Sequence, residues 1–202
     1  MKPFDSSNIL FCDNHLLVVH KPAGIATQPD LCDLAKAWVK STYHKPGAVF
    51  LEPIHRLDKP VSGLVLFART SKALSRLQQQ MREQQIEKTY EAWVEGSLEQ
   101  DHAILRHRLI HGSHRAEISP HGKEAVLEYT VLERKSGSTQ LQIQLHTGRY
   151  HQIRAQCAAI GHPILGDTKY SCRAAWKGEG IALKSVRLAF MHPISHEHVE
   201  IK

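Results

Sequence analysis

The sequence predicts an α+β domain built on a mixed, largely antiparallel β-sheet with a few flanking helices. Many short apolar or alternating segments are separated by turn residues, which is the pattern of β-strands. Only three segments show the apolar spacing of a helix. The chain has 202 residues, 42% of them hydrophobic, without an internal repeat or a flexible linker. We therefore expect one domain over residues 1–202.

Eight segments are predicted as strands from their apolar runs or alternation. In chain order they are 9–12, 16–20, 63–68, 86–94, 125–132, 141–145, 181–191 and 198–201. The first two flank Asp13-Asn14 and predict a β-hairpin, and the last two predict a closing hairpin around His192-Pro193. The run 63–68 is a continuous apolar strand. In segment 141–145, Gln142 and Gln144 alternate with apolar residues, so one face should be buried.

The three predicted helices are residues 31–43, 71–85 and 150–160. The first places Leu34, Trp38 and Val39 on one side and stops before a Pro-Gly pair. Ser71 is a candidate N-cap for the second helix. Gly161 is a candidate left-handed stop for the third.

Composition and termini exclude several classes of protein. No apolar stretch approaches the roughly 18 residues that a membrane-spanning helix needs. The N-terminus MKPFDSSN lacks the apolar core of a secretory signal, and the four cysteines include no CxxC pair. We expect a cytoplasmic protein with reduced thiols, no membrane partner and a monomeric state. The net charge of +6 is compatible with a nucleic-acid partner but is weak support by itself.

Three segments carry candidate chemistry, and each has a structural alternative. Residues 55–63, HRLDKPVSG, place Asp58 between cations in a loop before a strand, although a surface loop with an ordinary ion pair fits equally well. Residues 145–154 place Arg154 one step from the apolar stripe of a helix, where it could line a cleft or face solvent. Tyr90 faces the same side of its strand as Ala92, which is more typical of a core residue.

Taken together, four segments resemble the RluA family of pseudouridine synthases. HKPAG at 20–24 and HRLDKPVSG at 55–63 are similar to its first and second motifs. KTYEAWVEG at 88–96 resembles the segment with its active-site tyrosine, and residues 145–170 resemble its third motif and the stretch after it. The resemblance implies the pseudouridine synthase catalytic fold and isomerisation of specific uridines in structured ribosomal or transfer RNA. It implies no cofactor and no metal.

The resemblance also assigns roles to residues of this chain. Asp58 is the expected nucleophile or first base, and Arg154 is expected to hold its carboxylate charged. Tyr90 is expected to stack on the uracil and to move a proton late in the reaction. The target base must be flipped out of its helix to reach Asp58. The expected substrate-binding residues are Arg56, Leu57, Ile153, Arg149 and Lys21.

Two departures from the family pattern matter. Val61 stands where the family usually has threonine, which removes a hydroxyl close to the catalytic loop. Fewer residues precede Ile9 than a separate N-terminal RNA-binding module would need. We therefore expect the catalytic domain to hold its RNA without such a module.

A basic hairpin insertion around residues 101–124 is the predicted grip on the RNA backbone. Its expected phosphate contacts are Arg106, Arg108, Arg115 and Lys123, although a solvated loop is the alternative. His192, His196 and His198 suit a surface hairpin better than a metal site.

Two rival functions remain open from the sequence. The first is a non-catalytic RNA-binding or ribosome-assembly factor on the same fold. The second is a hydrolase that cleaves the glycosidic bond, for which Asp167 is the nearest second carboxylate. We expect Asp167 instead to cap a turn after Gly166.

Overall fold

The computed structural model describes residues 4–202, which form two compact units. Unit 1 contains the chain up to Ile86 together with Arg187–Lys202, and unit 2 contains Glu87–Val186. Strands and helices occur in both units, which confirms the predicted α+β class. No helix among residues 4–202 has the length and apolarity needed to cross a bilayer.

Unit 1 is a sheet with a helix on each side. Its strands are β1 (Ile9–Cys12), β2 (Leu16–Lys21), β3 (Glu52–Pro53), β4 (Ser62–Ala68), β10 (Leu183–Met191) and β11 (His198–Ile201). The part of β10 that begins at Arg187 belongs to unit 1. Its helices are α1 (Cys32–Thr42), α2 (Ser71–Arg82) and the short turns η1 (Ser6–Asn8) and η2 (Thr27–Leu31). The order is β1-β2-β4-β10, with β3 on β4 and β11 on β10. Both predicted hairpins, β1–β2 and β10–β11, are confirmed as antiparallel pairs.

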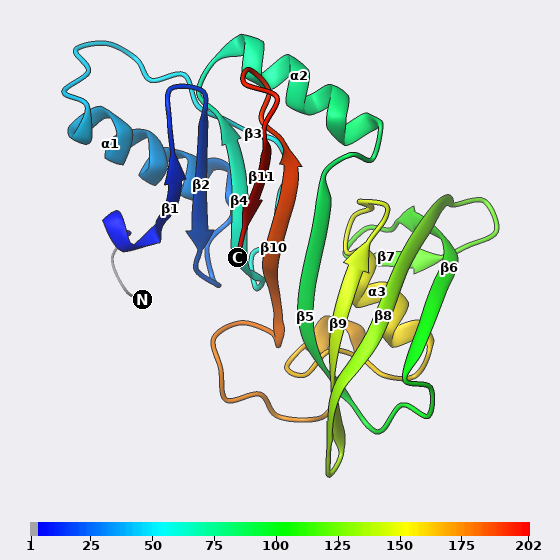
Figure 1. The fold of residues 1–202 in the computed structure, drawn as a ribbon. Coiled ribbons are helices and arrows are strands. Elements are labelled where there is room, and N and C mark those ends of the chain that lie inside the picture. Colours follow the sequence, from blue (N-terminus) through cyan, green and yellow to red (C-terminus); the bar gives the residue numbers. More distant parts are fainter. Residues whose placement is uncertain (1–3) are drawn as a thin grey trace. The chain divides into compact units, whose positions relative to one another are not determined.

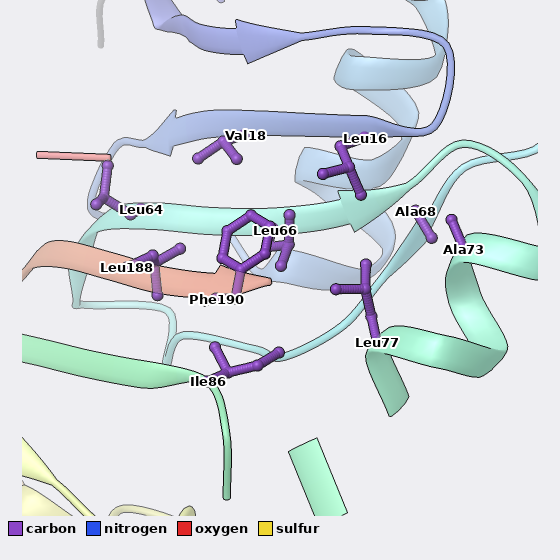
Figure 2. Packing of buried hydrophobic residues seen from close by; sticks show 10 residues of the cluster. All are labelled: Leu16, Val18, Leu64, Leu66, Ala68, Ala73, Leu77, Ile86, Leu188 and Phe190. Carbon is purple, nitrogen blue, oxygen red and sulfur yellow. The ribbon is translucent and has the colours of Figure 1, made fainter. Parts of the chain in front are cut away.

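The core of unit 1 lies on both faces of β2 and β4. Figure 2 shows the face beneath α2, with ten packed side chains: Leu16, Val18, Leu64, Leu66, Ala68, Ala73, Leu77, Ile86, Leu188 and Phe190. The alternate residues Leu17, Val19, Val65 and Phe67 are also fully buried. In Figure 1, α1 passes behind β1 and β2. The continuous apolar run predicted as a strand is therefore covered on both sides.

One helix boundary differs from the prediction. Thr70, rather than Ser71, is the N-cap of α2, because its hydroxyl accepts a hydrogen bond from Ala73 N at 3.2 Å. The helix ends at Arg82, before Gln84 adopts a positive φ of 57°. The apolar pattern could not distinguish two adjacent hydroxyl residues as caps.

Unit 2 is an antiparallel sheet with one helix packed against it. Its strands are β5 (Glu87–Glu95), β6 (His102–His111), β7 (Ala116–Ile118), β8 (Lys123–Lys135) and β9 (Ser138–Leu145), in the order β5-β9-β8-β6-β7. The basic segment 101–124 is not a free loop, since β6 pairs with β8 along eight residues. The helix α3 (Gln152–Ala159) packs on β6 and β7, as Figure 1 shows, and is followed by η3 (Thr168–Tyr170).

Alternation along the strands decides what faces α3. On β5, Tyr90, Ala92 and Val94 are buried, as the sequence predicted. Leu109, Ala116, Ala125, Ala155 and Tyr170 form a buried cluster between the sheet and α3. The helix begins two residues later than predicted, because His151 adopts a left-handed conformation with φ 51°.

Candidate active site

Asp58 lies in the loop of unit 1 between β3 and β4. The residue is half-buried, Leu57 before it is buried, and Arg56 is exposed. The Asp58 carbonyl accepts a hydrogen bond from Val61 N at 3.0 Å, which closes a turn around Lys59-Pro60. The loop thus offers a carboxylate beside an apolar side chain and a solvent-facing cation.

A buried lysine braces this loop from below. Lys21, at the end of β2, is 0% exposed, and its Nζ donates to the carbonyls of Pro22, Ile25 and Lys59 at 3.0, 2.8 and 3.3 Å. The last of these carbonyls belongs to the residue directly after Asp58. The assignment of Lys21 to substrate binding stays a prediction, and the contacts that the structure shows brace the loop of Asp58.

Thr27 holds the loop on the other side of Asp58. Its hydroxyl donates to Leu57 O at 3.0 Å and accepts from Leu57 N at 3.1 Å. The side chain is buried, so both backbone groups of Leu57 are satisfied away from water. Sequence reasoning did not identify Thr27, because the partner lies thirty residues away and threonine has no distinctive spacing.

Burial gives the Lys21 ammonium a pKa well below that of an ordinary lysine side chain. Burial lowers the pKa of Lys21 from 10.5 to about 8, against the opposing pull of the negative charges on Asp58 and Asp30. Between these pH values the folded chain binds fewer protons at this site than the unfolded chain does. The titration of Lys21 therefore increases the free energy of unfolding as the pH rises from about 8 to 10.5. Below about pH 8 this added stability is lost.

Carbon-13 NMR of the lysine ε-carbons measures this pKa directly. We expect one signal to titrate near pH 8 and to be absent in Lys21→Arg. A Lys21 signal that titrates together with the exposed lysines would contradict the assignment.

In unit 2, Arg154 forms a buried, two-pronged ion pair with Asp167. Nε lies 2.6 Å from Oδ2 and Nη2 lies 2.8 Å from Oδ1, and the two side chains are 4% and 2% exposed. The prediction that Asp167 caps a turn is wrong, since its side chain makes no capping hydrogen bond. The guanidinium fork instead uses both carboxylate oxygens, which fixes the plane of Arg154.

His151 links Arg154 to the neighbouring Tyr170. Arg154 Nη1 lies 2.9 Å from His151 Nε2, and a guanidinium can only donate, so Nε2 accepts. His151 Nδ1 then carries the hydrogen and donates to the Tyr170 hydroxyl at 3.1 Å. That hydroxyl also accepts from Ala116 N at 2.8 Å. This arrangement requires a neutral His151, because a second ring proton would face the guanidinium.

The outer side of His151 is covered by a stack of rings. The Tyr150 ring stacks on His151 at 3.9 Å between centroids, and His111 of β6 lies against Tyr150 at 4.0 Å. Tyr150 is 40% exposed. The stack holds His151, and through it Arg154, at the start of α3.

Tyr90, a predicted site residue, shares one face of β5 with Lys88. Lys88 and Tyr90 are each 6% exposed, and Ile153 on α3 is 5% exposed. The Lys88 ammonium lies 3.9 Å from the point where a Cβ on Gly148 would stand. The segment with the predicted tyrosine and the segment with Arg154 therefore meet within unit 2.

Comparisons with known proteins identify this combination of motifs. Residues 15–159 match the family described as RNA pseudouridylate synthase. The chain is 38% identical over 200 residues to the dual-specificity RNA pseudouridine synthase RluA of Pasteurella multocida, covering 94% of this chain and 89% of that protein. This chain belongs to the RluA family of pseudouridine synthases. RluA of Haemophilus influenzae is 37% identical over the same shares of the two chains.

Solved structures of more distant pseudouridine synthases share the fold of this RluA-family chain. Human RNA pseudouridylate synthase domain containing 1 has a TM-score of 0.80 and 24% identity, covering 100% of this chain and 85% of that one. Human RNA pseudouridylate synthase domain containing 4 has a TM-score of 0.82 and 22% identity, covering 97% of this chain and 87% of that one. At such identities the likeness shows the fold alone.

Two of the cations predicted to hold RNA line one depression on unit 2 of this RluA-family chain. Arg106 and Arg108 point away from α3, where they line an open depression of about 500 Å³ with His107 and Glu124. Arg115 lies in the β6–β7 turn and Lys123 is exposed at the start of β8. Arg149 is a further exposed cation, and its Nε donates to Glu124 O at 2.8 Å.

Proposed function

We propose that this chain isomerises specific uridines to pseudouridine in structured transfer or ribosomal RNA, with Asp58 as the nucleophile or first base. In this reaction the N1–C1′ bond breaks, the uracil turns, and C5 bonds to C1′. A proton leaves C5 and another reaches N1, so the product has the same composition as the substrate. The observation that carries the proposal is the doubly braced loop that presents Asp58, in a chain of the pseudouridine synthase family.

Charge is the main requirement on Asp58. A carboxylate must stay ionised to act, and a nearby guanidinium favours the ionised form. We assign that role to Arg154, with Arg149 as the second candidate. The buried pair with Asp167 supports the choice of Arg154, because it orients the guanidinium before any substrate arrives.

The remaining site residues act on the flipped nucleotide. Tyr90 would stack on the uracil and move a proton late in the reaction, while Leu57 and Ile153 would line its pocket. Exposed Arg56 would enter the space that the base leaves. Arg106, Arg108, Arg115 and Lys123 would contact the phosphate backbone.

We further propose that the enzyme acts as a cytoplasmic monomer. The four cysteines are free, which suits a reducing compartment. Light scattering of the purified chain at micromolar concentration should give the mass of one copy, and a stable dimer mass would refute the monomer.

The decisive experiment is a modification map. The purified chain is incubated with total RNA from cells that lack its gene, and pseudouridine is located by carbodiimide-stop sequencing. We expect at least one new pseudouridine and no free uracil. Release of uracil would support a hydrolase instead.

The same preparation tests the binding-factor alternative. A chain that forms no pseudouridine yet binds RNA, with an affinity that falls steeply as salt rises, would be an RNA-binding factor on this fold. Its affinity and its turnover must therefore be measured on the same RNA.

A further inference from the structure

The side chain of Lys88 is buried in unit 2, but its ammonium reaches solvent. The residue is 6% exposed, and its Nζ is not among the fully buried polar atoms of residues 4–202 that lack a hydrogen-bond partner. Lys21 is the instructive comparison within the same chain. That ammonium is held by three carbonyls and lies in the field of two carboxylates.

Withdrawing most of a lysine side chain from water disfavours its charged form unless a counter-charge compensates. Burial alone lowers the pKa of Lys88, with no counter-charge acting on it. A lysine that served only to fill space could be replaced by methionine without that cost. An anion that arrives with a ligand would supply the counter-charge that Lys88 lacks.

The surroundings of Lys88 leave room for such a ligand. Its ammonium faces Gly148, which is exposed and has no side chain to fill the space. A methyl group there would be at ordinary contact distance from Nζ, 3.9 Å, and anything larger would block the approach. Tyr90, the residue proposed to stack on the uracil, projects from the same face of β5 two residues away.

We propose that the Lys88 ammonium binds a phosphate of the flipped uridine nucleotide. This inference rests on the proposed function, and it names a contact that the motif residues do not supply. A phosphate is favoured over a carbonyl oxygen of the base because an anion supplies the counter-charge that is missing at Lys88. A compact ammonium is also a common phosphate ligand in proteins.

Mononucleotides test this contact separately from catalysis. Affinities for uridine, uridine 5′-monophosphate and uridine 3′-monophosphate are measured by NMR titration at fixed ionic strength. We expect the wild type to bind one of the monophosphates about 10- to 100-fold more tightly than uridine, the range of a charge-assisted hydrogen bond. Lys88→Met should bind uridine as the wild type does but lose the preference for phosphate. Lys88→Arg should keep most of the preference.

Two further variants control for indirect effects. Lys184→Met removes an exposed lysine of unit 2 and should retain the phosphate preference. Gly148→Val leaves Lys88 in place but fills the space in front of it, so it should lose the preference. Lys88→Met should melt at the same temperature as the wild type or higher, since burial disfavours the Lys88 charge and the variant breaks no ion pair.

Several results would overturn the proposal. They are a wild type without phosphate preference, a Lys88→Met variant that keeps it, and a Lys88→Met variant that loses affinity for uridine itself. Each of these would leave the proposed function intact if the wild type forms pseudouridine in RNA. Failure of the wild type to modify RNA would count against the proposed function instead.

Discussion

Asp58→Asn should abolish pseudouridine formation. The substitution keeps the size of the side chain and removes the anion that the reaction requires. Removal of a nucleophile in other enzymes lowers turnover by about 10⁴-fold or more, so we expect product below detection in a single-turnover assay. Asp58→Ala is measured in parallel, because asparagine can hydrolyse back to aspartate.

Asp30→Asn is the matched control for this loss. Asp30 is exposed, and its carboxylate, like that of Asp58, raises the pKa of Lys21. Its Oδ2 accepts from Ala26 N at 2.9 Å, a contact that asparagine can keep. Asp30→Asn should retain turnover within a few-fold of the wild type. Equal activity of Asp58→Asn and the wild type would remove Asp58 from the chemistry.

Much of the fold could be predicted because its signals are local. The alternation in β5 and β9 gave the buried face of each strand, and it is confirmed by Tyr90, Ala92 and Val94. The apolar run of β4 gave a strand that is covered on both faces. The start of α3 could not be predicted, because His151 fits the helical pattern and its left-handed backbone depends on contacts with Tyr150, Arg154 and Tyr170.

The candidate site also contains residues that could be predicted from the sequence and residues that could not. Asp58, Tyr90 and Arg154 were located through motif resemblance, and their roles remain predictions. The residues that support them were missed or misassigned, because support depends on contacts between distant parts of the chain. Thr27 binds Leu57 across thirty residues, and Asp167 binds Arg154 across thirteen. A local reading of Asp167 favoured a turn cap, whereas the fold uses its charge in the interior.

Asp167→Asn should destabilise the protein and slow the reaction. Removal of one partner of a buried ion pair takes away a counter-charge and costs up to about 3–5 kcal/mol in the free energy of unfolding. Arg154 keeps its charge in this variant but loses the carboxylate that fixes its plane. Loss of positioning on the order of an ångström lowers turnover by about 10²-fold. Urea denaturation and single-turnover kinetics, recorded well below the melting temperature, measure the two effects.

The double variant Arg154→Met with Asp167→Leu separates stability from catalysis. Apolar side chains of similar volume often replace a buried ion pair at no net cost, so the double variant should regain most of the stability that Asp167→Asn loses. It should nevertheless form no pseudouridine, because the cation assigned to Asp58 is gone. A stable and active double variant would show that Arg154 serves only the packing of unit 2. A stable and inactive one requires that the guanidinium act on the reacting site, since folding would then no longer explain the loss.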